Sequence, residues 1–460
     1  MILADLKKSI FSRLSVLCIT ITLLWTCLNI KEWRKEHFIG GDGFSYYAYL
    51  PALVICGDIK LQFLDTIKES YFSNLWFSRS ADGTRLTKMG AGVALLQSPF
   101  FLTAHFFAKR AGYIADGFSI PYKFSLCISC LFYAVAGFKI LRLVLLRFFP
   151  DKVVAATLLS IGLGTNLLCY ATLEPLMSHS YSFFLFSLLL YFTIRWHEKP
   201  GYKMAALLGT SAGLIALTRL PNSIVLIVPL LYGVNGVQDL KKKMSFFLEK
   251  KFQIMLMLLC ALLAFFPQLL YWKTISGQWF YYSYQDENFF FSHPHLTEGL
   301  LGYRKGWLVY TPLMFFALAG ILTLREKLKS FFLPLIIFLL LDIYIVLSWW
   351  CWWYGGSFGL RAFIETYALL ALPFAGFISY VSGKKLFLRW CLYLLVSFTV
   401  VLNLFQTYQY KREIISYDAM TEKAYWSVFG KLTYPEHFND MQQRPDYDNA
   451  KLGLEEKKIE

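Results

Sequence analysis

A lone carboxylate between glycines is the first residue of the chain whose type and setting could do chemistry. Asp42 stands in the stretch GGDGFSYYAYLP, residues 40–51. Gly-Gly-Asp-Gly is a natural chain reversal, because Asp bonds its own backbone in turns. A carboxylate held in a fixed position can instead take a proton from a reacting group. The stretch alone favours the turn, so its neighbours must decide between the two hypotheses.

Other charged and polar residues recur where apolar runs end. They are Lys88, Glu174, His179, Arg219, Asp286, Glu287, His293, His295, Arg304 and Arg361. Charged side chains that gather at the ends of several apolar runs indicate a binding or catalytic site. Two of them also have simple structural explanations: Arg219, before a proline, could snorkel to the interface, and Glu174, before Pro175, could cap the next helix.

The two histidines of the stretch SHPHL raise the question of a metal. His293 and His295 are two residues apart, which in an extended segment puts both on one side. With Asp286 or Glu287 they could hold a divalent metal ion. A mobile, aromatic-rich substrate loop is the preferred interpretation, so a divalent metal stays open and no other cofactor is indicated.

The composition indicates what kind of secondary structure positions these residues. Of 460 residues, 57% are hydrophobic and 18% aromatic, and repeated apolar runs of about 20 residues are typical of helices that cross a bilayer. The net charge of +15 is spread over short loops between these runs. It therefore indicates positive-inside topology and not a nucleic-acid partner. The nine cysteines lie mostly within apolar runs and indicate no disulfide framework.

Twelve apolar runs are candidates for spans, but the positive-inside rule predicts eleven. If residues 90–108 crossed the membrane, the basic loops at 239–251, 325–329 and 383–389 would all face outward. We therefore expect an all-α polytopic bundle in which residues 90–108 lie in the interface. The N-terminus is then cytoplasmic, a long first outer loop covers 31–120, and a tail at 408–460 lies outside.

The layout of residues 1–407 resembles the GT-C superfamily of membrane glycosyltransferases, which includes protein O-mannosyltransferases and the lipid A aminoarabinose transferase. Asp42 stands where the family has its catalytic acid, just after the first span. The stretch LTKMG (86–90) resembles the family's short Lys motif, although its usual acid and proline are here Thr87 and Met89. LEPLMSH (173–179) resembles the acid-Pro motif of the second outer loop. YRKGWLVYTP (303–312) and WWYGGSFGLR (352–361) are similar to stretches in bacterial members.

The resemblance implies a sugar donor linked to a polyprenyl phosphate and a catalytic site on the periplasmic face of a bacterial inner membrane. Such a donor already carries a good leaving group, so one base suffices for transfer to a saccharide, lipid-saccharide or protein acceptor. Asp42 is the expected base. Cations must meet the departing phosphate, and the candidates are Lys88, Arg219, Arg304 and Arg361. Candidates for contacts to substrate or metal are Glu174, His179, Asp286, His293 and His295.

Two other classes of protein compete with this hypothesis. An O-antigen ligase or polymerase also combines many spans with a large outer loop, but a polymerase usually carries that loop later in the chain. A non-enzymatic transporter or flippase would place charges along a path through the bilayer, whereas here they gather on one side. The sequence also shows no inverted pair of broken spans of the kind that marks many transporters.

Overall fold

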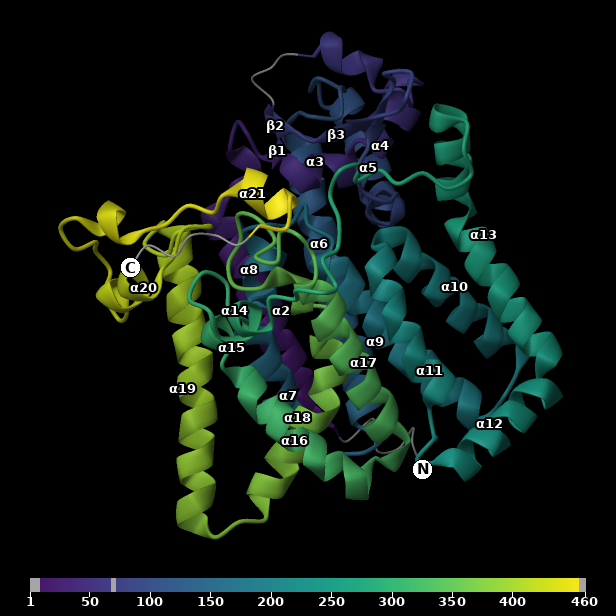
Figure 1. Cartoon of the computed structure of the whole chain (residues 1–460), viewed down its shortest axis with the longest axis vertical. Coiled ribbons are helices and arrows are strands. Elements are labelled where there is room, and N and C mark those ends of the chain that lie inside the picture. Colours follow the sequence, from purple (N-terminus) through teal and green to yellow (C-terminus); the bar gives the residue numbers. More distant parts are fainter. Residues whose placement is uncertain (1–8, 68–71, 455–460) are drawn as a thin grey trace.

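The structure, a computed structural model, describes residues 9–67 and 72–454 and is mainly helical (Figure 1). The helices of the bundle are α2 (Ile10–Ile30), α6 (Ile120–Leu145), α7 (Asp151–Leu163), α9 (His179–Glu198), α10 (Tyr202–Thr218), α11 (Ile227–Leu231), α13 (Lys251–Ser276), α16 (Leu313–Lys327), α17 (Lys329–Leu347), α18 (Tyr367–Ser382) and α19 (Leu386–Lys411). All nine cysteines are free thiols.

Five helical segments in the described residues are long and apolar enough to cross a membrane. They are Ile10–Arg34, Ile120–Leu145, Lys251–Ser276, Lys329–Leu347 and Leu386–Lys411. The expected class, an all-α protein with several membrane-spanning helices, therefore agrees with the fold. The expected total of eleven spans stays a prediction, because other bundle helices, such as the 13-residue α7, are shorter than the roughly 20 residues that a bilayer core requires.

The bundle has two distinct ends. At one end, the backbone N–H groups of Phe11 and Ser12 in α2 donate to Asp151 of α7, and Arg142 of α6 donates to Ser12. We call this the basic end. Figure 1 shows that α12 (Val237–Glu249) and the α16–α17 and α18–α19 turns lie there too. The basic loops at 239–251, 325–329 and 383–389 thus lie at one end, as expected.

The opposite end, which we call the site end, lies one length of α9 away from the basic end. This helix of 20 residues runs from His179 at the site end to Glu198, which pairs with Arg147 at the basic end. A rise of 1.5 Å per residue makes α9 about 30 Å long. The two ends are therefore separated by about the thickness of a bilayer core.

A cap covers the site end between α2 and α6. Its elements are η1 (Glu32–Arg34), β1 (Ile39–Gly40), α3 (Gly41–Tyr47), α4 (Tyr49–Pro51), η2 (Ala52–Cys56), η3 (Gln62–Asp65), β2 (Phe72–Leu75), β3 (Phe77–Arg79), β4 (Arg85–Thr87) and α5 (Gly92–Arg110). Strands β1 and β2 pair in parallel, with Ile39 opposite Phe72, and β3 and β4 form an antiparallel hairpin. Figure 1 places these elements together at the top of the view.

Helix α5, the apolar run that we expect not to span, packs along only the first half of α6. His105 of α5 contacts Tyr122 near the start of α6, with 2.5 Å between Nδ1 and the hydroxyl oxygen. Further down, the carbonyl of Leu96 accepts a hydrogen bond from Tyr133 at 2.9 Å. Helix α5 therefore belongs to the cap and does not run the length of the bundle.

The remaining short elements lie mostly at the site end. They are α8 (Leu167–Thr172), η5 (Leu220–Leu226), α14 (Leu296–Leu301), α15 (Trp307–Tyr310), η6 (Arg361–Phe363), α20 (Glu422–Val428), η7 (Phe438–Met441) and α21 (Tyr447–Lys451). The segment after α19 is folded against the bundle: Trp426 donates to the hydroxyl of Tyr303 at 3.1 Å, and Lys451 pairs with Asp286 at 3.1 Å. The described part of the tail is therefore folded and docked on the site end.

Close helix packing depends on glycines at defined places. Gly209 and Gly213 of α10 are four residues apart and meet Met257 and Ala261 of α13, which are also four apart. A Cβ at either glycine would overlap the α13 backbone. Small residues at this spacing let two helix backbones approach closely in a membrane. At the end of α10, Leu217 and Thr218 lie against Gly90 and Gly92, which brings Arg219 beside the cap.

Candidate functional site

The carboxylate of Asp42 forms a buried ion pair with Arg361. Oδ2 of Asp42 lies 2.7 Å from Nη2 of Arg361, and the two side chains are 11% and 10% exposed. The other guanidinium nitrogen, Nη1, lies 3.6 Å from the sulfur of Met177. Asp42 is therefore not merely a solvent-facing turn residue.

The local chain explains why Asp42 stands at this position. Gly41 has a φ of +52°, a backbone conformation that only glycine adopts freely. A Cβ at Gly43 would lie 2.7 Å from the Cβ of Leu176. The two glycines thus turn the chain from β1 into α3 and let α3 approach the segment between α8 and α9. Asp42, in the first turn of α3, is held against that segment.

A second buried carboxylate, Glu365, organises the neighbouring cluster. Its Oε1 lies 2.9 Å from Nη1 of Arg219, 3.2 Å from Nδ1 of His179 and 3.4 Å from Nδ2 of Asn222. Glu365 is 1% exposed. Burial acts to raise its pKa, but His179 and Arg219 outweigh burial, so the pKa of Glu365 is lowered from its ordinary value.

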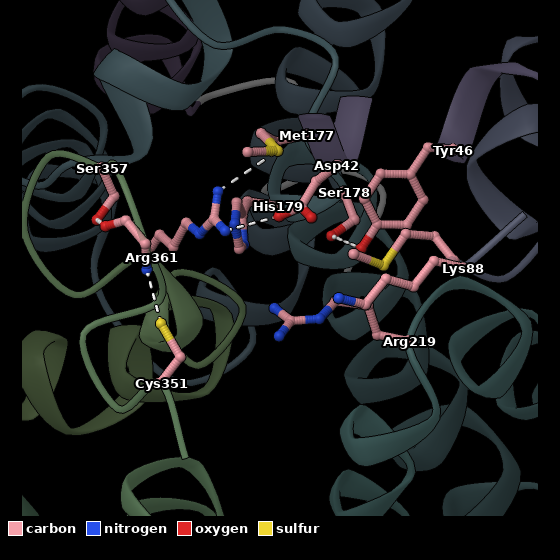
Figure 2. A network of polar contacts seen from close by, with 12 residues as sticks. Asp42, Tyr46, Lys88, Met177, Ser178, His179, Arg219, Cys351, Ser357 and Arg361 are labelled. Atoms are coloured by element: carbon pink, nitrogen blue, oxygen red, sulfur yellow. Dashed lines mark hydrogen bonds and ion pairs between the residues drawn. The ribbon is translucent and has the colours of Figure 1, made fainter. Parts of the chain in front are cut away.

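The two ion pairs are parts of one network. Arg361 and Glu365 are four residues apart in the junction between η6 and α18, so one short segment supplies the cation for Asp42 and the anion for Arg219. Tyr46 lies within electrostatic range of Asp42, Arg219 and Arg361. Figure 2 shows the side chains of Arg361 and Arg219 approaching the region beside Asp42 from different elements.

Both arginines keep hydrogen-bond donors to spare. In the part of the chain that the structure describes, Arg219 donates only through Nη1, to Glu365. Arg361 donates through Nη2 to Asp42, and Nη1 meets only the weak acceptor sulfur of Met177. The two guanidinium groups also repel each other, since each lies within range of the other's charge. A bound anion would accept hydrogen bonds from the unused N–H groups of both arginines. Its negative charge would also reduce the repulsion between the two guanidinium groups.

Glu174 lies near Arg361 and has an altered acidity. Burial raises the pKa of Glu174 to about 7, and Arg361, Lys35 and Lys411 oppose this effect. Helix α9 begins at His179, so Glu174 precedes the first turn of α9 and does not cap it. A carboxyl with a pKa near neutrality exchanges protons readily at physiological pH.

Lys88 lies at the edge of the same region, paired with an acid from a distant loop. Its ammonium contacts Oε1 of Glu287, while Oε2 of Glu287 accepts a hydrogen bond of 3.0 Å from the indole of Trp350. The ammonium also lies 5.1 Å from the ring centre of Tyr284. The pair has side-chain exposures of 15% and 13%, so Lys88 is partly accessible.

Other candidates from the sequence lie apart from this network. Arg304 donates to the carbonyl of Gln443 at 3.3 Å and lies 5.5 Å from the ring of Trp353, which ties it to the C-terminal segment. Asp286 pairs with Lys451. His295 stacks on Trp352, and exposed His293 has Ser292 within 2.9 Å.

The described residues offer no metal centre. Across residues 9–67 and 72–454, no group of three or more His, Cys, Asp or Glu side chains is arranged to hold an ion. His293 and His295 do not converge with Asp286 or Glu287, because each meets a different neighbour. The structure therefore gives no support to the metal alternative in this loop.

Sequence reasoning missed Glu365. It stands in the stretch GLRAFIETYALLALPF, residues 359–374, as the one acid of a mostly apolar segment whose only other charge is Arg361. An ionisable residue at such a position is by default a functional candidate, so the signal was present. Asp342 of α17 lies within electrostatic range of Glu365 and Arg219, which places a further acid near the network.

Comparison with known proteins does not assign the chain to a family. No protein-family model matches it, and no curated protein matches its sequence. The likeness to the GT-C superfamily therefore rests on the motifs of the sequence and on nothing beyond them. The chemistry of the site must be argued from the geometry of Asp42, Glu174, Arg219, Arg361 and Lys88.

Proposed function

We propose that the protein is a glycosyltransferase that moves a sugar from a polyprenyl-phosphate donor to a hydroxyl-bearing acceptor at the site end of the bundle. The observation that carries the proposal is the buried carboxylate of Asp42, held by Arg361 beside a second arginine with unused donors. The acceptor is a saccharide, a lipid-saccharide or a protein. The class of donor and acceptor comes from the resemblance to the GT-C superfamily.

The proposed reaction balances without a metal or redox partner. The acceptor oxygen attacks the anomeric carbon of the sugar, and the bond between that carbon and the phosphate oxygen breaks. The acceptor proton passes to a carboxylate, and the polyprenyl phosphate leaves with the electron pair. Positioned cations stabilise the charge that develops on the phosphate.

Two linked roles for Arg361 are part of the proposal. In the free protein it pairs with Oδ2 of Asp42 at 2.7 Å, so that oxygen is already occupied. A donor phosphate would compete for the same guanidinium through Nη1 and Nη2, because arginine binds phosphate in bidentate fashion. Oδ2 of Asp42 would then be free to take the acceptor proton once the donor is bound. Arg219 and Lys88 supply further positive charge.

The proposed orientation follows from the distribution of charge. The basic end, with its lysine- and arginine-rich loops, faces the cytoplasm according to the positive-inside rule. The site end then faces the periplasm of a bacterial inner membrane, where the isoprenoid tail of the donor stays in the bilayer and its phosphate lies at the interface.

Donor binding is the first test. The purified protein in lipid nanodiscs is titrated with undecaprenyl phosphate, and binding is followed by tryptophan fluorescence. We expect saturable binding that Arg361→Gln and Arg219→Gln each weaken by roughly 10-fold or more, since a charge-assisted contact contributes about 1.5–3 kcal/mol. Binding that neither substitution changes would contradict the proposal.

The competing classes give different results in the same system. A flippase reconstituted in vesicles would move a fluorescent polyprenyl phosphate between leaflets without breaking the sugar–phosphate bond. An O-antigen ligase or polymerase would need a sugar chain on a polyprenyl diphosphate and would not use a single sugar on a monophosphate. The proposal requires cleavage of the monophosphate donor, so either of these results would contradict it.

A further inference from the structure

A hollow lies between α2 and α6, at the basic end and far from the network around Asp42. Its volume is about 480 Å³, and its lining residues are Arg13, Val16, Leu17, Thr20, Val135, Lys139, Arg142 and Leu143. This volume is in the range of small-molecule sites. The hollow has no part in the proposed transfer reaction, so a ligand bound there is independent of that reaction.

The lining forms two helical stripes that face each other. On α2 the residues are spaced three and four apart from Arg13 to Thr20, and on α6 the spacing from Val135 to Leu143 is similar. Residues at such spacings share one helix face. The helices run in opposite directions, because Ser12 near the start of α2 meets Arg142 near the end of α6. Arg13 is therefore level with Arg142, and Thr20 with Val135.

The hollow is consequently amphipathic along its length. Arg13, Arg142 and Leu143 lie at its end nearest the basic loops, Lys139 lies about one helical turn further in, and no acid is among the lining residues. Its inner end is lined by Leu17, Thr20 and Val135. From Arg13 to Thr20 the helix rises about 10 Å, so the apolar part extends well into the depth of the bilayer core.

Among the residues that the structure describes, the charged groups that line or adjoin the hollow are mainly positive. Arg142, 9% exposed, donates through Nε to Ser12 and through Nη2 to Ser9, and Nη1 has no acceptor among the described residues. Asp151, an acid within electrostatic range of Arg142, accepts from the backbone N–H groups of Phe11 and Ser12 and so faces the α2 backbone. Lys152 lies over the ring of Phe11 and adds a further cation.

We propose that this hollow binds an anionic membrane phospholipid from the leaflet at the basic end. The phosphate of the headgroup lies among Arg13, Lys139 and Arg142, and the start of one acyl chain lies along Leu17, Thr20 and Val135. Cationic pockets between membrane helices on the cytoplasmic side bind anionic headgroups in this way. The bound lipid would hold α2 against α6 and so support the first span, after which the chain enters the cap and reaches Asp42.

Lipid titration tests the proposal directly. The purified full-length protein is titrated with phosphatidylglycerol or phosphatidylcholine in detergent, and bound lipid is counted by native mass spectrometry. We expect phosphatidylglycerol to bind more tightly. Arg13→Gln/Lys139→Gln should weaken its binding by about 25-fold, at about fivefold for each cation near the headgroup, and should leave phosphatidylcholine unchanged. Both side chains are at least partly exposed, so the double variant should fold.

Two further variants separate the site from general surface charge. Lys203→Gln/Lys241→Gln removes two cations at the same end outside the hollow and should change binding by less than about twofold. Thr20→Trp fills the apolar part without changing the charge and should also weaken phosphatidylglycerol binding, which headgroup attraction alone would not predict.

Four outcomes would overturn the proposal. These are unchanged phosphatidylglycerol binding in Arg13→Gln/Lys139→Gln, an equal loss in the control pair, displacement of the lipid by excess inorganic phosphate, and preferential filling by undecaprenyl phosphate. The third would indicate a site for free anions, and the fourth a second site for an isoprenoid lipid.

Discussion

The carboxylate of Asp42 and the guanidinium of Arg361 lie 2.7 Å apart across 319 residues of sequence. Each is nearly buried, so each would be an unpaired charge without the other. Breaking a buried pair from one side costs about 3–5 kcal/mol, whereas removing both charges can cost much less. The effect of breaking this pair on the stability of the folded protein can therefore be predicted without reference to any substrate.

Arg361→Gln should lower the thermal stability of the protein more than the double variant Asp42→Asn/Arg361→Gln. The single variant leaves the Asp42 carboxylate without its cation, whereas the double variant leaves a neutral amide pair. The measurement is the unfolding temperature in detergent. Equal losses in the two variants would mean that Asp42 is already neutralised by another group.

Lys88→Met should weaken binding of undecaprenyl phosphate by roughly 10-fold while the fold is kept, because one cation near a phosphate is removed from a partly accessible position. Glu287→Gln is the sharper companion variant, since it frees Lys88 from its acidic partner and should leave binding intact or strengthen it. Lys60→Met, at an exposed position of the cap, is the control. If all three variants bind alike, Lys88 does not meet the phosphate.

Glu174→Gln should raise the unfolding temperature above pH 7 and not at pH 5. The folded protein holds the Glu174 proton up to about pH 7, whereas an unfolded glutamate releases it near pH 4.5. Between these values the folded state binds more protons than the unfolded state, so stability falls as pH rises. The glutamine variant lacks this loss. A difference between the two proteins that is the same at pH 5 and pH 8 would show that Glu174 does not titrate in this window.

The proposed topology places positions 115 and 430 on the outer side and position 242 in the cytoplasm. Ala115→Cys, Gly430→Cys and Lys242→Cys, made after replacement of the exposed Cys18 and Cys56, can be labelled in intact cells with a thiol reagent that does not cross the membrane. We expect labelling at the first two positions only. Labelling at position 242, or protection at either of the others, would contradict the arrangement in which residues 90–108 do not span.

The sequence predicted the class of fold and several members of the site because membrane proteins restrict where charge can lie. Asp42, Glu174, His179, Arg219 and Arg361 interrupt or end apolar runs, and the structure brings all five to one end of the bundle. The sequence could not predict their pairing. Arg361 was expected to meet a phosphate, but in the free protein it neutralises Asp42.

Other parts of the site depend on contacts that spacing does not encode. Arg304 and Asp286 have the same signature as the others, yet both meet the C-terminal segment, whose docked position the sequence left open. Glu365 stands four residues after Arg361 at the start of an apolar run, and its role is visible only in its contacts with His179 and Arg219. Lys88 and Glu287 pair across 199 residues of sequence. This contact also could not be predicted from residue spacing.

Turnover by Asp42→Asn tests the central claim most directly. The purified protein is given a panel of labelled single sugars on polyprenyl phosphate, and the released polyprenyl phosphate is measured with saccharide acceptors or with water. Asp82→Asn is the matched control, because Asp82 also precedes a glycine in a turn of the cap, where it accepts from Ser80 and Thr84. We expect the wild type and Asp82→Asn to cleave the same donor, and Asp42→Asn to be slower by roughly 10² to 10⁴-fold with donor binding kept, the usual contribution of a general base. Equal turnover by a folded Asp42→Asn protein would contradict the account and return Asp42 to the role of a paired turn residue.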